Sequence, residues 1–244
     1  MIISHKYKFI FIRIPRCGTD VITESLSPYL GQEDEVNLTQ FTSSKEIKQV
    51  INAEIWDNYF KFAFVRSPWE MEISSYQSWG RPDVSFREYI LNYSYEVNEK
   101  TLSDFLGEDI DYVGRHETLE KDFSYLCGEL NLPKINLILP RTKVNLGDFD
   151  NQKALNWFSI SQSGTPVMLP EQEKHIPDSV IKSYYSENKV IGKMYSKYHK
   201  DIKLFNYEMP GLFDSPEDLN KFVYFCKSNT CPGHSQPHHK CVNH

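Results

Sequence analysis

Apolar and polar residues along the chain are arranged as strands that alternate with helices. Residues 7–14 form an apolar run that predicts a strand, and a turn connects it to a helix over roughly residues 19–29. A second apolar run at 59–65 predicts another strand. Residues 110–115 predict a short third strand, which an amphipathic helix follows at once.

Helical periodicity covers much of the remaining chain. Apolar residues recur at helical spacing over 45–59, 116–132 and 178–200. Ser67-Pro68 predicts the start of a further helix after the second strand, because serine is a favourable N-cap and proline suits the first helical position.

Strands that alternate with helices predict an α/β fold with a central, P-loop-like, mainly parallel sheet flanked by helices. The polar stretches 31–44 and 133–175 predict loops. Beyond Tyr207 the composition changes to short apolar pieces and a run rich in Cys, His and Pro. We therefore expect a single domain over residues 1–207 and a C-terminal extension over 208–244.

Composition limits the classes of function that the chain can have. The 244 residues are 40% hydrophobic and 25% charged, as in ordinary globular proteins, and the net charge is −6. A negative net charge argues against nucleic-acid binding, so any anion site must be local. No apolar run is long enough for a transmembrane segment, and the N-terminal run lacks the features of a signal peptide, so we expect a cytoplasmic protein.

The turn after the first strand has the composition of an anion site. Gly18 lets a ligand approach the backbone, Arg16 supplies a guanidinium, and Thr19 supplies a hydroxyl at the start of a helix whose first amides lack helical partners. The alternative is a tight strand–helix turn that carries a surface arginine. The stretch is not a Walker A motif, which requires G-x-x-x-x-G-K-[ST].

A second basic residue lies at the end of the second strand. Arg66 occupies the carboxyl end of that strand, where ligands of open α/β sheets bind, and Ser74 follows about two helical turns later. The alternative is a capped helix with a solvated arginine and an ordinary serine.

Four stretches, in order, resemble the motifs of sulfotransferases, and the last two are similar to the carbohydrate-type branch. "PRCGTDV" resembles the 5′-phosphosulfate loop, Pro-Lys-Ser-Gly-Thr-Thr or a variant of it, and "VRSPWEMEISSY" resembles the 3′-phosphate motif. "DYVGRHETLEKDFSYLCGEL" is similar to the Phe-Ile-Gly-Arg-Phe-Glu-Asn-Leu segment and its helix, and "MYSKYHKDIKLFNY" is similar to the closing Tyr-x-x-Asp-x-x-x-Phe-x-Tyr. The resemblance covers roughly residues 8–207.

The resemblance implies transfer of a sulfuryl group from 3′-phosphoadenosine 5′-phosphosulfate (PAPS) to a hydroxyl or amine of an acceptor, which we expect to be a carbohydrate or glycoconjugate. Arg16 matches the catalytic loop lysine, and Arg66 and Ser74 match the 3′-phosphate ligands. The remaining donor-binding residues that it implies are Cys17, Gly18, Thr19, Asp20 and Val21 in the turn and, more loosely, Arg141 and Lys143.

The sequence departs from the usual loop at two positions. Arginine replaces lysine at position 16, as in the tyrosylprotein branch, and Asp20 places a carboxylate where it would repel a dianion unless it faces away or meets a proton or cation.

The general base in several branches is a glutamate roughly twenty residues after the loop. We therefore expect Glu33 or Glu35 to be catalytic, with a solvated acidic loop as the alternative. His116 is the other titratable candidate, but its position at a helix start favours a structural role.

The C-terminal run carries ligand types suited to zinc, but its spacing matches no standard zinc finger. Its Cys and His residues are Cys226, Cys231, His234, His238, His239 and Cys241. A structural zinc site, a flexible tail and a Cys231–Cys241 bridge all remain open, and no catalytic metal is expected.

A P-loop-like phosphotransferase and a nucleotide-binding protein without catalysis are the alternative functions.

Overall fold

The computed structural model describes residues 1–37, 41–79, 81–137, 176 and 178–208. The chain divides into two compact units. The first comprises residues 1–67 and 100–175, and the second comprises residues 68–99 and 176–244.

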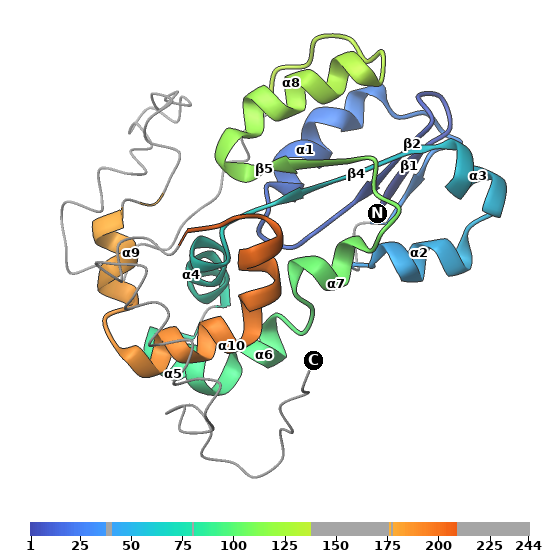
Figure 1. The fold of residues 1–244 in the computed structure, drawn as a ribbon. Coiled ribbons are helices and arrows are strands. Elements are labelled where there is room, and N and C mark those ends of the chain that lie inside the picture. The colour runs from blue at the N-terminus through green and yellow to red at the C-terminus, as the bar shows by residue number, and fades with distance from the viewer. Residues whose placement is uncertain (38–40, 80, 138–175, 177, 209–244) are drawn as a thin grey trace. The chain divides into compact units, whose positions relative to one another are not determined.

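The first unit is built around a five-stranded sheet with the order β3-β1-β2-β4-β5 (Figure 1). Its strands are β1 (Ile2–Ser4), β2 (Phe9–Ile12), β3 (Glu35–Val36), β4 (Phe60–Val65) and β5 (Tyr112–Arg115). β2, β4 and β5 are parallel, whereas β1 pairs antiparallel with both β2 and β3. The sheet is thus mixed, and the predicted parallel part is confirmed for its three predicted strands.

The two antiparallel strands were not predicted from the sequence. β1 is three residues long and forms a hairpin with β2, in which Lys8 adopts a positive φ of 53°. β3 has two residues and lies inside the stretch expected to be a loop. Strands this short carry no readable alternation, so tertiary pairing rather than local pattern establishes them.

The helices of the first unit are α1 (Thr19–Leu26), α2 (Ser44–Val50), α3 (Ala53–Asn58), α7 (Leu102–Leu106) and α8 (Leu119–Glu129). Short 3₁₀ turns follow α1 at Ser27–Tyr29 and precede α8 at His116–Thr118. The helix predicted over 45–59 is two helices. Asn52 interrupts it because its side chain accepts a hydrogen bond from the Glu54 amide and starts α3 as an N-cap.

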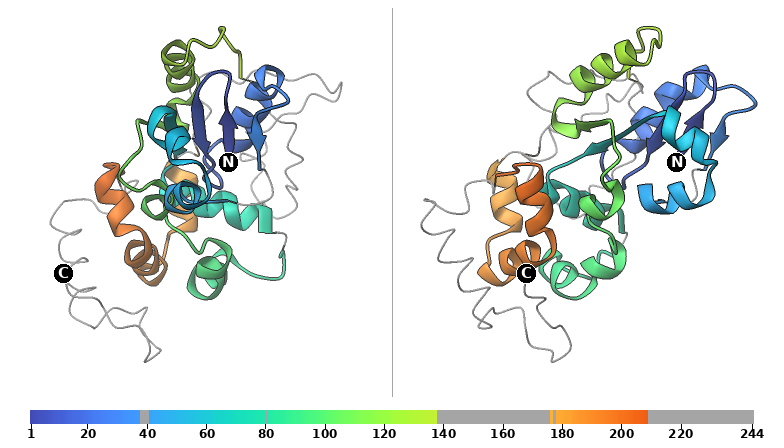
Figure 2. Two further views of the ribbon diagram at one scale, coloured as in Figure 1. Left: turned by 90° about the vertical axis from the view of Figure 1, so that its right-hand side faces the viewer. Right: turned by 45° about the vertical axis from the view of Figure 1, so that its right-hand side comes forward.

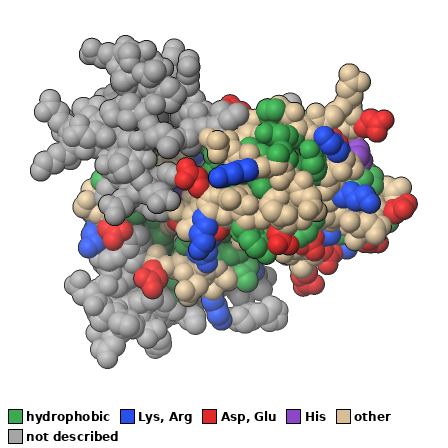
Figure 3. Space-filling view, turned by 90° about the horizontal axis from the view of Figure 1, so that it is seen from above, with side chains coloured by type: hydrophobic (Ala, Val, Ile, Leu, Met, Phe, Trp, Pro, Cys, Tyr) green, Lys and Arg blue, Asp and Glu red, His purple; other side chains and the backbone are tan. Residues whose placement is uncertain are grey.

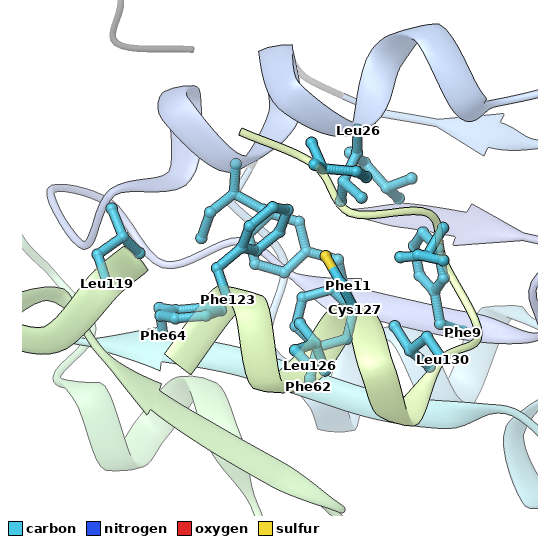
Figure 4. Close-up of a cluster of buried hydrophobic side chains, with 14 residues drawn as sticks. Phe9, Phe11, Leu26, Phe62, Phe64, Leu119, Phe123, Leu126, Cys127 and Leu130 are labelled. Carbon is cyan, nitrogen blue, oxygen red and sulfur yellow. The ribbon is translucent and has the colours of Figure 1, made fainter. Parts of the chain in front are cut away.

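One face of the sheet forms the principal apolar core (Figure 4). Phenylalanines from β2 and β4 meet the apolar stripe of α8 and the inner side of α1, and Figures 1 and 2 show both helices along that face. The fully buried aromatic side chains of this core are Phe9, Phe11, Phe62, Phe64 and Phe123. Gly114 on β5 is required by this packing, because a Cβ there would lie 2.4 Å from the Phe64 ring. This core fixes the ends of the strands relative to α1 and α8.

The second unit is helical in the residues that the structure describes. Its helices are α4 (Pro68–Trp79), α5 (Phe86–Glu88), a π-helical turn (Tyr89–Tyr93), α6 (Ser94–Val97), α9 (Asp178–Tyr184) and α10 (Asn188–Leu204). The start of α4 at Pro68 agrees with the predicted helix start. The helix predicted over 178–200 divides into α9 and α10 at residues 185–187.

A buried polar network joins the helices of this second unit. The Glu72 carboxylate accepts hydrogen bonds from the Lys197 ammonium at 2.9 Å, the Tyr89 hydroxyl at 2.7 Å and the Asn98 amide at 3.1 Å, and also from the Tyr198 hydroxyl. Lys197 donates further to the Ser94 carbonyl oxygen at 2.7 Å. The side chains of Lys197 and Glu72 are 1% and 0% exposed, so this ion pair is fully desolvated.

Candidate functional site

The three parallel strands end at one edge of the sheet, and the predicted anion-binding turn lies at that edge. β2 ends at Ile12, and the turn follows it directly. Residues 66–67 follow β4, and residues 116–118 follow β5, whose last residue is Arg115. Ligands of parallel sheets bind at this edge, because the loops after neighbouring strands converge there.

The turn has the strained backbone of a strand–helix connection. Gly18 has φ 77°, and Arg16 has φ 63°, a conformation that is uncommon for residues other than glycine. The first bond of α1 runs from the Ile22 amide to the Gly18 carbonyl oxygen at 3.1 Å, so the amides of residues 19–21 precede the helical ladder. The backbone thus presents amides at the positive end of the α1 dipole.

The residues of the turn differ in what they expose. Arg16 and Asp20 are exposed, Cys17 is buried, and Val21 packs partly against the apolar core. The Thr19 hydroxyl, which the sequence suggested as an anion donor, instead donates to the Ile14 carbonyl oxygen inside the turn. In this structure Thr19 therefore stabilises the shape of the turn.

Two arginines of the predicted site come together. The Arg66 guanidinium, at the end of β4, donates through Nη1 to the carbonyl oxygen of Arg16 at 3.4 Å. The following amide, that of Ser67, donates to the Glu117 carboxylate at 2.6 Å, which ties the end of β4 to the turn after β5. The structure thus holds two strand ends and the turn against one another.

His116 also lies at the turn. A Cβ built on Gly18 would lie 3.3 Å from His116 Cδ2 and 3.2 Å from Leu119 Cδ2, so glycine permits the start of α8 to approach the backbone closely. Arg115 precedes it, and its amide donates to the Asp122 carboxylate at 2.7 Å. The end of β5 therefore adds an imidazole to this edge of the sheet.

The two predicted carboxylate bases lie elsewhere in the first unit. Glu35, on β3, pairs with Ile3, which pairs with Ile10, so Glu35 lies two strand spacings, about 10 Å, from β2. Its carboxylate is 3.8 Å from His5 Nε2. Glu33 adjoins Asp34, whose carboxylate binds the His5 amide at 2.6 Å near the beginning of β2.

These contacts place the acidic loop toward the amino-terminal ends of the strands. The structure does not bring Glu33 or Glu35 to the turn. Hydrogen bonds from the Gly31 and His5 amides and the Ser4 hydroxyl to Asp34 hold the loop in this position. Desolvation acts to raise the pKa of Asp34, but these hydrogen bonds outweigh it and lower that pKa below 3.8. Asp34 therefore anchors the loop as a carboxylate.

The other predicted donor ligands remain predictions. Ser74 lies on α4 in the second unit, where its carbonyl oxygen accepts from the Ser78 hydroxyl at 2.8 Å. Arg141, Lys143 and the Cys/His-rich extension lie outside the described residues. In the part of the chain that is described, no group of three or more His, Cys, Asp and Glu residues is arranged to hold a metal ion.

The structure also brings Arg13 to the site, although the sequence analysis gave it no role. Its guanidinium lies 3.5 Å from the Asp20 carboxylate and is the cation that this unusual acid meets. The sequence offered one indication of this role: Arg13 directly follows a strand and stands seven residues before Asp20, an acid in the first turn of a helix. Only the fold shows that the two side chains meet.

Surface charge is mixed on the face seen in Figure 3. Lys and Arg side chains are interspersed there with Asp, Glu and hydrophobic side chains rather than gathered in one basic field. This agrees with the net charge of −6 and with a local anion site. Within the described residues, no helix has both the length and the apolar character needed to cross a membrane.

Comparisons with protein-family models, with curated proteins and with solved structures gave no match for this chain.

Proposed function

We propose that the protein is a PAPS-dependent sulfotransferase that transfers a sulfuryl group to a hydroxyl or amine of a carbohydrate-bearing acceptor. The observation that supports this most directly is the contact between the Arg66 guanidinium and the Arg16 carbonyl oxygen at 3.4 Å. The two motifs that resemble the donor-binding segments of sulfotransferases thereby meet at the carboxyl ends of β2 and β4.

The turn would bind the 5′-phosphosulfate. Backbone amides at the start of α1 suit the phosphate and sulfuryl oxygens, because they lie at the positive end of the helix dipole. The glycine at position 18 lets the backbone of the turn lie close to His116 and Leu119, because a Cβ there would be 3.3 Å and 3.2 Å from their side chains. Arg16 is exposed at the turn and would place its guanidinium on the same group.

Arg66 would bind the 3′-phosphate. Ser74, Arg141 and Lys143 are proposed as further contacts on the resemblance alone. A 3′-phosphate ligand distinguishes PAPS from ATP, because ATP has a hydroxyl at that position. This selectivity is the most direct test of the proposal.

In the reaction the acceptor oxygen or nitrogen attacks sulfur, and the bond from sulfur to the bridging phosphate oxygen breaks. Negative charge grows on that oxygen, which leaves with 3′-phosphoadenosine 5′-phosphate (PAP). A guanidinium held beside it stabilises the transition state more than the ground state. The acceptor proton passes to a general base.

His116 is the base that this geometry favours. It lies beside Gly18, whereas Glu35 lies with His5 on the far side of β1. A general base must come within hydrogen-bond reach of the proton that it removes. The distance of each candidate from the turn is therefore a stricter criterion than its pKa. Glu33 and Glu35 are the carboxylates to test against it.

Calorimetric titration with PAP and ADP tests the donor site. The wild type should bind PAP much more tightly than ADP, and Arg66→Ala should weaken PAP binding by about 1.5–3 kcal/mol, the range for hydrogen bonds to charged groups. Arg81→Ala is the matched control, because Arg81 is exposed and pairs with Asp83 in the second unit. Equal binding of PAP and ADP by the wild type would exclude a 3′-phosphate site.

Single-turnover rates on an acceptor test the base. His116→Asn should lower the rate by about 10²–10⁴ and leave PAP affinity nearly unchanged, whereas Glu33→Gln and Glu35→Gln should keep the wild-type rate. The reverse pattern would assign the base to the acidic loop.

A further inference from the structure

Arg13 and Asp20 form an ion pair of unequal exposure next to the turn. The Arg13 side chain is 5% exposed and the Asp20 side chain is 75% exposed, and Nη2 lies 3.5 Å from Oδ1. Arg13 also donates through Nη1 to the Asn37 carbonyl oxygen at 3.5 Å, and its guanidinium lies 5.2 Å from the centre of the Phe41 ring. The cation is therefore held from several sides, and the carboxylate reaches it from solvent.

Asp20 has two opposed effects at its position. A carboxylate in the first turn of α1 is favourable for the helix alone, because it faces the positive end of the dipole. The same carboxylate lies at the amides that would receive an anion, and like charges at short range repel. A turn that binds a dianion needs this charge to be cancelled or turned away.

The position of Arg13 meets that need. Burial lowers the pKa of Arg13, while Asp20 acts to raise it. An arginine remains protonated even so, and a buried positive charge is screened little by salt. Arg13 follows β2 directly, and its buried guanidinium meets Asp20 without being exposed at the turn itself.

We infer that Arg13 is a positioning residue of the anion site: it holds the Asp20 carboxylate and cancels its charge, so that an anion can bind at the turn. The inference rests on the proposed function only in requiring that an anion binds there. It explains how a chain with aspartate at this position retains an anion site. It also assigns to Asp20 a role as counter-ion rather than ligand.

The test compares the wild type with Arg13→Gln, Asp20→Asn, the double variant Arg13→Gln/Asp20→Asn, and Arg13→Lys. Each protein is titrated with PAP and, separately, with inorganic sulfate, and its thermal unfolding is measured without ligand. Arg13→Gln should weaken anion binding about tenfold or more, because the charge of Asp20 is then not cancelled. Asp20→Asn should bind at least as tightly as the wild type, and the double variant should return to within about threefold of it.

The rescue separates electrostatic positioning from a structural role. If the double variant binds as weakly as Arg13→Gln, Arg13 serves only the fold and the inference is wrong. If Asp20→Asn alone weakens binding about tenfold, the charge of Asp20 does not oppose the anion and the inference is also wrong. Asp20 is exposed, so Asp20→Asn still tests the inference if Arg13→Gln does not fold. Arg13→Lys should stay close to the wild type.

The two ligands distinguish this inference from the proposed function. Binding of sulfate with the expected rescue, but without a preference for PAP over ADP, would support the inference and exclude the PAPS site. Failure of the wild type to bind either anion would overturn both.

Discussion

The desolvated Glu72–Lys197 pair gives the sharpest prediction about stability. Lys197→Met keeps much of the length and volume of the side chain but removes the ammonium. The Glu72 carboxylate would keep the hydroxyls of Tyr89 and Tyr198 and the Asn98 amide as donors and would lose the ammonium that pairs with it. A carboxylate without that cation would then remain in an interior from which water is excluded.

The magnitude follows from what remains around the carboxylate. Removing one partner of a buried ion pair costs about 3–5 kcal/mol. Neutral donors remain on Glu72, so we expect the lower part of that range, about 3 kcal/mol. Glu72→Gln removes the charge but keeps an acceptor oxygen. The double variant should therefore be less destabilised than the sum of the two single variants by about 1–3 kcal/mol.

Urea unfolding of the wild type, the two single variants and the double variant measures this coupling, and hydrogen exchange in α4 and α10 assigns the loss to the second unit. Lys200→Met is the matched control, because Lys200 is an exposed residue of the same helix, and it should change stability by less than about 0.5 kcal/mol. If Lys197→Met is as stable as Lys200→Met, or if the single effects add in the double variant, this account of the ion pair is wrong.

Three further predictions concern the first unit. Gly18→Ala should destabilise it by roughly 1–2 kcal/mol and weaken PAP binding, because φ at this position is 77° and the new Cβ would crowd Leu119. An unchanged free energy of unfolding would show that the backbone at this position is not strained. The native pKa of Asp34 lies below its ordinary value of 3.8, so its contribution to stability is present above that pH and is lost as the pH falls through the native pKa; Asp34→Asn should flatten this acid loss in unfolding experiments. Burial first, and then Asp122, raises the pKa of Tyr112 from 10.0 to about 12, so stability should fall as the pH rises between these values, and phenolate absorbance should show a late titration that is missing in Tyr112→Phe.

Strong local signals in the sequence were enough to specify several elements. The apolar runs that became β2 and β4 are long enough to specify buried strands, and the amphipathic stripe of α8 specifies a helix with one inner face. Gly18 after a strand specified a turn, and the structure gives that glycine a φ of 77°. These features depend on residues that are close in the chain, so their pattern can be read directly.

Pairings between distant residues depend on the folded arrangement instead. β1 and β3 have too few residues for a pattern and exist because their backbone groups pair with a neighbouring strand. The same pairing, with Asp34 bound to the His5 amide, carries Glu33 and Glu35 away from the turn, although their spacing from Arg16 suggested a base. Spacing along a loop does not fix the direction in which the loop runs.

The chemistry of the site divides in the same way. The sequence identified Arg16 and Arg66 as candidates because each follows a strand, and a parallel sheet brings such ends to one edge. Only the fold assigned the Thr19 hydroxyl to the Ile14 carbonyl oxygen and paired Arg13 with Asp20. Hydrogen bonds and ion pairs depend on ångström distances between side chains, and those distances are set by how the core packs.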